Sequence, residues 1–152
     1  MTDKVYLDAN ILIAHQVKDH NYHQKATKLI DDFWLKKCIL AISALTMDEF
    51  FYGIVFILQR SQQNIKTVPF ATFAPKIEKA TQAILSWNTI ELVEFKNNPH
   101  EIMKTINIMK NHNFRPRDAF HLRIMQQNGI DSIATFDNDF NRLKNIGINI
   151  IS

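Results

Sequence analysis

Residues 115–140, RPRDAFHLRIMQQNGIDSIATFDNDF, contain the pattern that decides the fold. Residues 115–128 predict a helix, which Gly129 can end in the left-handed conformation that glycine adopts without strain. The apolar run that begins with SIAT at Ser132 predicts a buried strand. Asp137 and Asp139 follow that strand at once, and charged groups rarely lie against a core without a partner. The stretch therefore predicts a helix, a turn and a strand that delivers carboxylates to its carboxyl end.

The amino-terminal end of the chain shows a similar arrangement. Residues 4–7, KVYL, predict a short buried strand, and Asp8 follows it directly. Gly147, like Gly129, stands between an expected helix and an expected strand, where an αβ connection favours glycine. Alternation of strands and helices predicts a parallel sheet with helices on both faces, and ligands of such sheets bind beyond the carboxyl ends of the strands. Asp8 and Asp137 should therefore lie at one edge of an α/β fold.

Periodicity and end signals predict the remaining elements. Ser43 is expected to cap the helix that follows it. Residues 60–75, which are polar and contain two prolines, are expected to form the longest loop. The expected strands cover 4–7, 38–43, 89–95, 132–135 and 148–152, and the expected helices 9–16, 20–36, 44–59, 76–87, 99–112, 115–128 and 139–145.

Composition describes an ordinary globular protein. A chain of 152 residues is expected to form one domain, 1–152, and its net charge of +3 permits an anionic partner without requiring one. The single cysteine, Cys38, lies in an apolar run, which indicates a core residue in a reducing compartment. The longest apolar run, at 50–58, is too short to span a bilayer. We therefore expect a cytoplasmic protein.

Glu49 shares a predicted helix face with Leu45, Tyr52 and Phe56. This places the carboxylate in an apolar stripe of a helix that is expected to be mostly buried, and a buried carboxylate needs a cation, a donor or a proton. A salt bridge to lysine or arginine is the competing interpretation. Asp48 ranks below Glu49 because it is turned by about 100° around the helix.

The other acids also have simple alternatives. Asp8 can cap the helix that begins near residue 9, and either Asp137 or Asp139 can cap the helix after it. Asp118, in the first turn of its own helix, can interact favourably with the positive end of the helix dipole. Taken together, however, two strand ends and two helices bring oxygen ligands that can converge on one edge, and such ligands favour Mg²⁺ or Mn²⁺ over zinc.

The order of YLDAN, LTMDEF, RPRDAFHL and IATFDNDF resembles that of the PIN-domain ribonucleases, above all the VapC-type toxins of toxin–antitoxin pairs. The resemblance implies a three-layer α/β/α sandwich with a central, mainly parallel sheet. It also implies metal-dependent endonucleolytic cleavage of RNA by a metal-activated water. The catalytic and metal-binding residues that it implies are Asp8, Glu49, Asp118 and Asp137, with Asp139 as an extra metal ligand and Asn10 and Thr135 as supporting polar residues.

The resemblance further implies an RNA substrate, a cognate antitoxin and a possible homodimer. Arg115 and Arg117 are the favoured RNA contacts, because cations are needed around an acidic site that receives phosphates, whereas Arg142 and Lys144 are expected to be solvated surface charges. A catalytically idle PIN-like module that binds RNA or protein is the alternative. A receiver-like phospho-acceptor is disfavoured, because the first strand is followed only by Asp8 and the acid pair lies at the other end of the chain.

Overall fold

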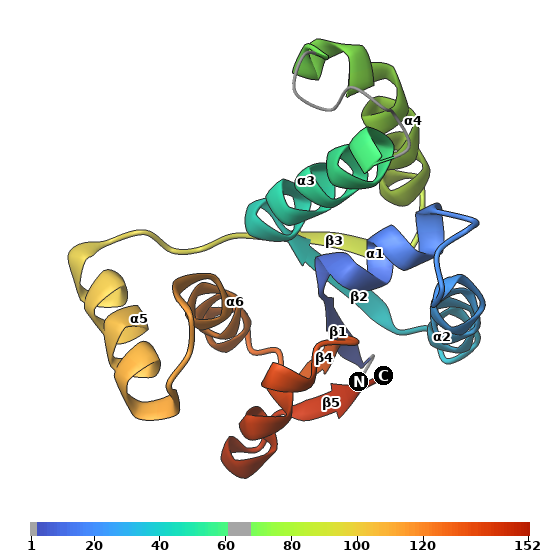
Figure 1. Ribbon diagram of the computed structural model, residues 1–152. Helices are drawn as coiled ribbons and strands as arrows, with labels where there is room; N and C mark the ends of the chain where they lie inside the picture. Colours follow the sequence, from blue (N-terminus) through green and yellow to red (C-terminus); the bar gives the residue numbers. More distant parts are fainter. Residues whose placement is uncertain (1–2, 61–67) are drawn as a thin grey trace.

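The computed structural model describes residues 3–60 and 68–152 (Figure 1). Strands form wherever the short apolar runs predicted them. They are, in chain order, β1 (Lys4–Leu7), β2 (Ile39–Ser43), β3 (Ile90–Val93), β4 (Ser132–Ala134) and β5 (Asn149–Ile151).

Helices fill the segments between the strands. The α-helices are α1 (Ala9–Gln16), α2 (His23–Leu35), α3 (Ala44–Arg60), α4 (Ala74–Leu85), α5 (Pro99–His112) and α6 (Pro116–Gln127). Two 3-10 helices, η1 (Phe70–Phe73) and η2 (Asn138–Ile146), complete the described elements. Gly129 and Gly147 have φ values of 64° and 83°, so both take the left-handed conformation expected of them.

The sheet has the order β3-β2-β1-β4-β5, and all of its pairs are parallel. The chain leaves β1 toward β2 on one side and returns to β4 on the other. The boundary between β1 and β4 is therefore a topological switch point, where open α/β sheets bind their ligands. This arrangement confirms the predicted parallel α/β sheet.

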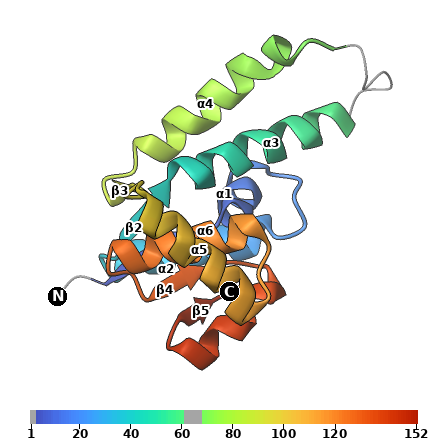
Figure 2. The same ribbon diagram turned by 90° about the vertical axis from the view of Figure 1, so that its left-hand side faces the viewer.

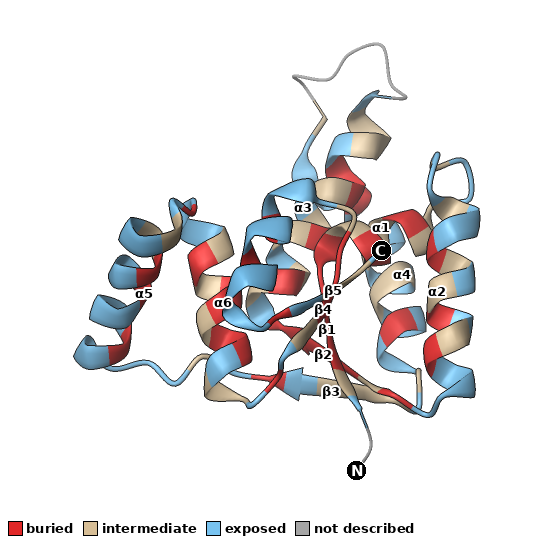
Figure 3. Ribbon diagram, turned by 90° about the horizontal axis from the view of Figure 1, so that it is seen from below, coloured by how far each residue is buried: buried red, intermediate tan, exposed pale blue. Residues whose placement is uncertain are grey.

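Helices cover both faces of the sheet, as Figure 1 shows, with α5 and α6 on one side and α1 and α2 on the other. Because side chains alternate along a strand, Leu7 and Ile42 belong to one core, with α1, α2 and α3. Tyr6 and Ile133 belong to the second core, with α6 and η2. The helix faces turned toward the sheet are the buried ones (Figure 3). The three-layer α/β/α sandwich is thus confirmed.

Two expectations for the middle of the chain were wrong. Of the expected loop at 60–75, residues 61–67 lie outside the described part, but Phe70–Phe73 forms η1 and α4 begins at Ala74. The apolar stripe containing Glu49 is not buried either, since Tyr52 and Phe56 are 62% and 58% exposed. The buried residues of α3 are instead Thr46, Phe50, Ile54 and Val55.

Helices α3 and α4 run side by side and extend beyond the sheet (Figure 2). Near its middle α3 crosses α1 closely: a Cβ atom at Gly53 would lie 2.2 Å from the Ile13 Cδ1 atom. Within the described residues, no helix has the length and apolar character needed to cross a bilayer.

Candidate functional site

Asp8 and Thr135 lie side by side at the switch point, each one residue beyond the end of its strand. Leu7 and Ala134 are paired in register, and the Asp8 backbone N–H donates to the Ala134 carbonyl at 3.0 Å. The two side chains are 127 positions apart in the chain, yet the Thr135 Oγ1 donates to Asp8 Oδ2 at 2.6 Å. The parallel pairing of β1 with β4 therefore builds the centre of the site.

Asn10 closes a small hydrogen-bonded ring with these two residues. Its Nδ2 donates to Asp8 Oδ2 at 2.8 Å and to Thr135 Oγ1 at 3.2 Å, while its Oδ1 accepts from the Phe136 N–H at 3.1 Å. Asp8 occupies the N-cap position of α1, although its side chain makes no capping hydrogen bond of standard geometry. The backbone N–H of Asn10 still acts on the Asp8 carboxylate and lowers its pKa, so part of the expected capping interaction remains. Asn10 and Thr135 fix one carboxylate oxygen of Asp8, Oδ2.

Glu49 points toward the same edge from α3 and is held by a buried histidine. The Glu49 Oε2 atom lies 3.0 Å from His121 Nε2, and Arg117 approaches Oε1 at 3.9 Å. The side chain of Glu49 is 21% exposed. Glu49 thus has basic partners, as the competing interpretation expected, but it reaches the edge from a partly open helix face.

A buried chain of hydrogen bonds continues from His121 into the core. His121 is 2% exposed, and its Nδ1 lies 2.8 Å from the Tyr6 hydroxyl. That hydroxyl is 2.6 Å from Ser43 Oγ and accepts from Thr46 Oγ1 at 3.0 Å. Ser43 Oγ also accepts from the Thr46 N–H at 3.2 Å, the cap expected at the start of α3. β1, β2, α3 and α6 are therefore joined beneath Glu49 by a network whose polar groups are satisfied.

Asp118 lies in the first turn of α6, and Asp137 and Asp139 lie at the start of η2. Asp137 is the N-cap of η2, because one of its carboxylate oxygens accepts from the Asp139 N–H at 2.8 Å. Asp139 instead lies 3.5 Å from the Arg142 guanidinium. The structure thus assigns the capping role to Asp137 and leaves the Asp139 carboxylate paired with Arg142.

Burial and neighbouring charges raise the pKa of two of these acids, Asp8 and Asp118. Burial raises the pKa of Asp8 above its usual range, and the charge of Glu49 raises it further. Partial burial raises the pKa of Asp118, with added contributions from Asp137, Glu49 and Asp139. Asp8, Glu49, Asp118, Asp137 and Asp139 therefore share one electrostatic environment and do not lie on separate surfaces.

The candidate ligands have the chemistry that suits a hard divalent cation, because they are carboxylate, amide and hydroxyl oxygens. A cation would also offset the burial and the repulsion that raise the pKa values of Asp8 and Asp118. Across residues 3–60 and 68–152, however, no three His, Cys, Asp or Glu side chains stand in an arrangement that could hold a metal ion. Glu49 and Asp137 are engaged by His121 and by the cap of η2. The predicted ligands are thus gathered at one edge without forming a closed cage.

Sequence reasoning missed two residues at this edge. His121 follows Asp118 by three positions, so both lie on one side of α6, and a lone histidine among Leu122, Ile124 and Met125 signals a buried group that needs partners. Arg142 was expected to be a solvated surface charge, but it donates to the carbonyls of His112 and Asn113. Of the expected RNA contacts, Arg117 pairs with Asp48 at 3.6 Å and Glu49 at 3.9 Å.

A known family model covers most of the chain. The model of the PIN domain matches residues 5–146, so the chain belongs to the PIN-domain family. Searching the curated proteins gave no significant match.

Solved structures of VapC-type toxins share the fold. Mycobacterium tuberculosis VapC20, described as a sarcin-ricin-loop-cleaving toxin, is 18% identical over 90% of this chain and 92% of its own, with a TM-score of 0.58. A toxin–antitoxin complex from Klebsiella pneumoniae is 15% identical over 97% and 96%, with a TM-score of 0.61. VapBC2 from Rickettsia felis, bound to a DNA fragment from its promoter, is 14% identical over 97% and 96%, with a TM-score of 0.60.

Proposed function

We propose that this chain is a Mg²⁺- or Mn²⁺-dependent endoribonuclease and the toxin of a toxin–antitoxin pair. The observation that carries the proposal is the buried carboxylate of Asp8, which is fixed by Thr135 and Asn10 at the switch point and lies within the field of Glu49. Membership of the PIN-domain family supports the same conclusion. The position of Asp8 at the switch point also supports the proposal, because open parallel sheets bind their ligands there.

The proposed chemistry needs little from the protein beyond charge and position. A divalent ion, when bound, lowers the pKa of its water and stabilises charge that develops on the phosphate. Asp8, Glu49, Asp118 and Asp137 would hold that ion, with Asp139 as an additional oxygen donor. Thr135 and Asn10 orient Asp8, while His121 orients Glu49 from the core side. Residues that orient ligands in this way typically change metal affinity or activity about 10- to 100-fold when removed.

RNA cleavage tests the proposal. Purified protein is incubated with labelled RNA in Mn²⁺ or in EDTA, beside Asp8→Asn, which keeps the side-chain shape and removes the charge. Cleavage is expected only with Mn²⁺, and Asp8→Asn should lower its rate by about 100-fold or more, as for loss of one electrostatic group at an active site. Asp19→Asn is the matched control, because Asp19 is an exposed acid in the turn that follows α1. Equal cleavage by Asp8→Asn and wild type would exclude this site.

A catalytically idle module that binds RNA or protein is the second candidate. The observation that favours it is that both oxygens of Glu49 already have partners, His121 by a hydrogen bond and Arg117 by an ion pair, without a metal. RNA binding without cleavage in either Mg²⁺ or Mn²⁺ would support this function. Metal-dependent cleavage that Asp8→Asn abolishes would exclude it.

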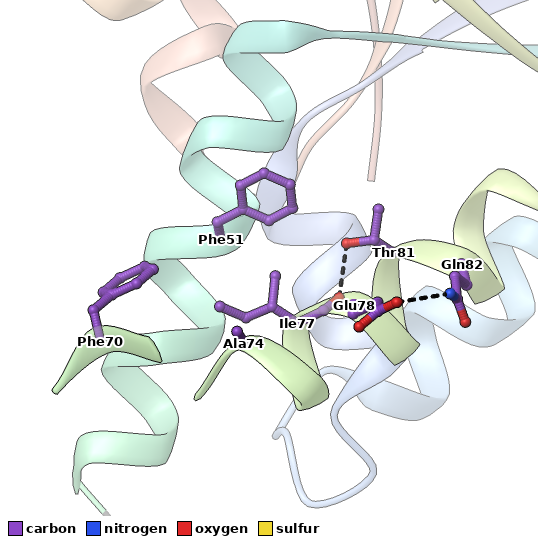
Figure 4. A pocket seen from close by; sticks show the side chains of 7 residues that line it. All are labelled: Phe51, Phe70, Ala74, Ile77, Glu78, Thr81 and Gln82. Carbon is purple, nitrogen blue, oxygen red and sulfur yellow. Dashed lines mark hydrogen bonds between the residues drawn. The ribbon is translucent and has the colours of Figure 1, made fainter. Parts of the chain in front are cut away.

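The proposed antitoxin is a protein partner, and exposed apolar surface supports it. A groove of about 1000 Å³ between α3, α4, β3 and α6 is lined mainly by apolar side chains, including Leu85 and Leu92, which are 48% and 65% exposed. A second hollow, of about 380 Å³, lies between α3 and α4, where Phe51 and Ile77 face each other (Figure 4). Contiguous exposed apolar surface of this kind marks interaction sites.

Sedimentation of the purified chain separates an antitoxin from a second copy as the occupant of the large groove. If the purified chain sediments as a monomer, no second copy covers the groove, and the groove remains available to an antitoxin. A dimer that Leu92→Lys dissociates would assign the groove to a homodimer. In either case, we propose that the protein acts in the cytoplasm, where its free and buried Cys38 would remain reduced.

A further inference from the structure

A pocket of about 310 Å³ lies beside Asp118, between the turn that joins α5 to α6 and the start of η2. Its lining is almost entirely polar and carries two arginines and two aspartates. The lining residues are Asn113, Phe114, Arg115, Asp118, Asp139 and Arg142. The pocket therefore borders the proposed active site but is built from residues that the metal site does not use, apart from Asp118 and Asp139.

Arg142 is held firmly in this pocket. Its Nη1 donates to the Asn113 carbonyl at 2.8 Å and to the His112 carbonyl at 3.3 Å. Its guanidinium lies over the Phe114 ring at 5.3 Å, and its Nη2 is 3.5 Å from Asp139. These contacts place the guanidinium before any ligand arrives, so that little side-chain entropy remains to be lost on binding. The described contacts leave Arg142 Nε without a partner.

Arg115 supplies the second cation from the opposite wall. It is exposed, and no ion pair or side-chain hydrogen bond is found for it in the part of the chain that the structure describes. Arg115 is also the N-cap of α6, and no side chain caps that helix. The uncapped backbone N–H groups of the first turn favour an anion at the same place.

We propose that this pocket binds a phosphate of the RNA strand next to the one that is cleaved, with Arg115 and Arg142 as its two cationic contacts. The proposal rests on the proposed function. The two arginines balance the charges of Asp118 and Asp139, so a divalent ion on the acids would leave the pocket with excess positive charge. A planar guanidinium can donate two parallel hydrogen bonds to two oxygens of one phosphate, a geometry that a single-atom anion cannot match.

Fluorescence anisotropy tests the proposal with a short labelled single-stranded RNA, in Ca²⁺ and over a series of salt concentrations. Arg142→Gln and Arg115→Gln are each expected to weaken binding about tenfold, as for loss of a charge-assisted hydrogen bond. Each should also reduce the slope of log affinity against log salt by about 0.7, the value for one phosphate contact to a single strand. Inorganic phosphate should compete with RNA better than chloride at equal ionic strength, because the two guanidinium groups can bind its oxygens.

Arg60→Gln is the matched control. Arg60 is exposed at the end of α3 and stacks on Phe56 at 5.4 Å, much as Arg142 stacks on Phe114, but it lies far along α3 from the pocket. It should leave the affinity and the salt slope unchanged. Arg115→Gln keeps the test valid if Arg142→Gln unfolds the turn, because among the described residues the Arg115 side chain has no ion pair or hydrogen bond that the substitution would remove.

Two results would overturn the proposal. One is an unchanged salt slope in Arg115→Gln and in folded Arg142→Gln, and the other is an equal loss of affinity in Arg60→Gln. Failure of the proposed function has a different signature, since RNA would then remain uncut by the wild-type protein in Mn²⁺, whatever the salt slopes.

Discussion

At the residue scale, Tyr6 connects the hydrophobic core to the candidate metal site. Its hydroxyl contacts Ser43, Thr46 and His121, and burial raises its pKa to about 12, so it remains a neutral hydrogen-bonding group. Losing it leaves buried polar partners without their bonds, and each such group costs about 1–3 kcal/mol. His121 would then lose the contact that orients it toward Glu49.

Tyr6→Phe is therefore expected to lower the free energy of unfolding by about 1–3 kcal/mol, the cost of unpaired buried groups. Urea unfolding followed by circular dichroism measures this. Tyr52→Phe is the matched control, because Tyr52 is 62% exposed and should change little. Equal stability of Tyr6→Phe and wild type would mean that the buried network does not support the site.

Asp8 illustrates a conflict between stability and function. Its pKa in the folded protein is raised by burial, so the charged carboxylate destabilises the fold as pH rises above the ordinary range of aspartate. In EDTA, Asp8→Asn should be more stable than wild type at neutral pH, and the difference should disappear at low pH, where Asp8 is protonated. Thermal unfolding across pH measures this, with Asp19→Asn as a control. A less stable Asp8→Asn at neutral pH would contradict the expected cost of charge at this position.

The residue-scale contacts could be predicted only in part. The strand ends placed Asp8 and Asp137 correctly, because strand direction fixes where a chain exits the sheet. The pairing of Glu49 with His121 could not be predicted, since the partners are 72 positions apart and lie on different helices. The hydrogen bonds from Arg142 to the His112 and Asn113 carbonyls depend on the path of the α5–α6 turn, which local sequence does not determine.

At the element scale, the carboxylate of Glu101 on α5 binds side chains of α6, the helix that carries Asp118. Glu101 accepts hydrogen bonds from Gln127 at 2.7 Å and from Arg123, both on α6. The bond from Gln127 and the Arg123 guanidinium lower the pKa of Glu101 from 4.5 to about 2. A lowered carboxyl pKa stabilises the fold above its ordinary value, and this stabilisation is lost as pH falls through the folded value.

The free energy of unfolding should accordingly fall between about pH 4.5 and pH 2 in the wild type. In Glu101→Gln this part of the pH dependence should be absent, with lower stability at neutral pH. Glu94→Gln is the control, because Glu94 is exposed and its side chain has no recorded partner among the described residues. A Glu101→Gln profile parallel to that of wild type would show that the carboxylate does not join the two helices.

Element types followed from the sequence, but helix faces did not. Strand runs and glycine stops predicted all five strands and the ends of α6 and η2. The buried face of α3 was assigned wrongly because apolar residues occupy every side of that helix from Phe50 to Ile57, so periodicity cannot select one. Tyr52 and Phe56 are exposed while Phe50, Ile54 and Val55 in the same stretch are buried, so tertiary packing selects the buried face of α3.

The whole molecule brings distant parts of the chain to one edge. β1 and β4 are separated by most of the sequence, yet their pairing creates the switch point where Asp8 meets Thr135. Asp8 and Asp118 lie there although burial, and to a lesser extent neighbouring acids, raises their pKa values, so that their charged forms destabilise the metal-free fold; this is the pattern expected of a functional site. The alternation of strands and helices along the sequence was enough to predict the fold class. The distances between the acids depend on how the helices pack, which the sequence pattern does not determine.

Direct measurement of Mn²⁺ binding tests the central claim, that these acids form one cation site. The electron paramagnetic resonance signal of free Mn²⁺ is followed as protein is added. Wild type and Asp19→Asn should remove the signal with equal affinity, and Asp8→Asn and Asp118→Asn should each weaken binding about 10-fold or more. Undiminished Mn²⁺ binding by both Asp8→Asn and Asp118→Asn, or none by the wild-type protein, would contradict the assignment of this edge as a metal site.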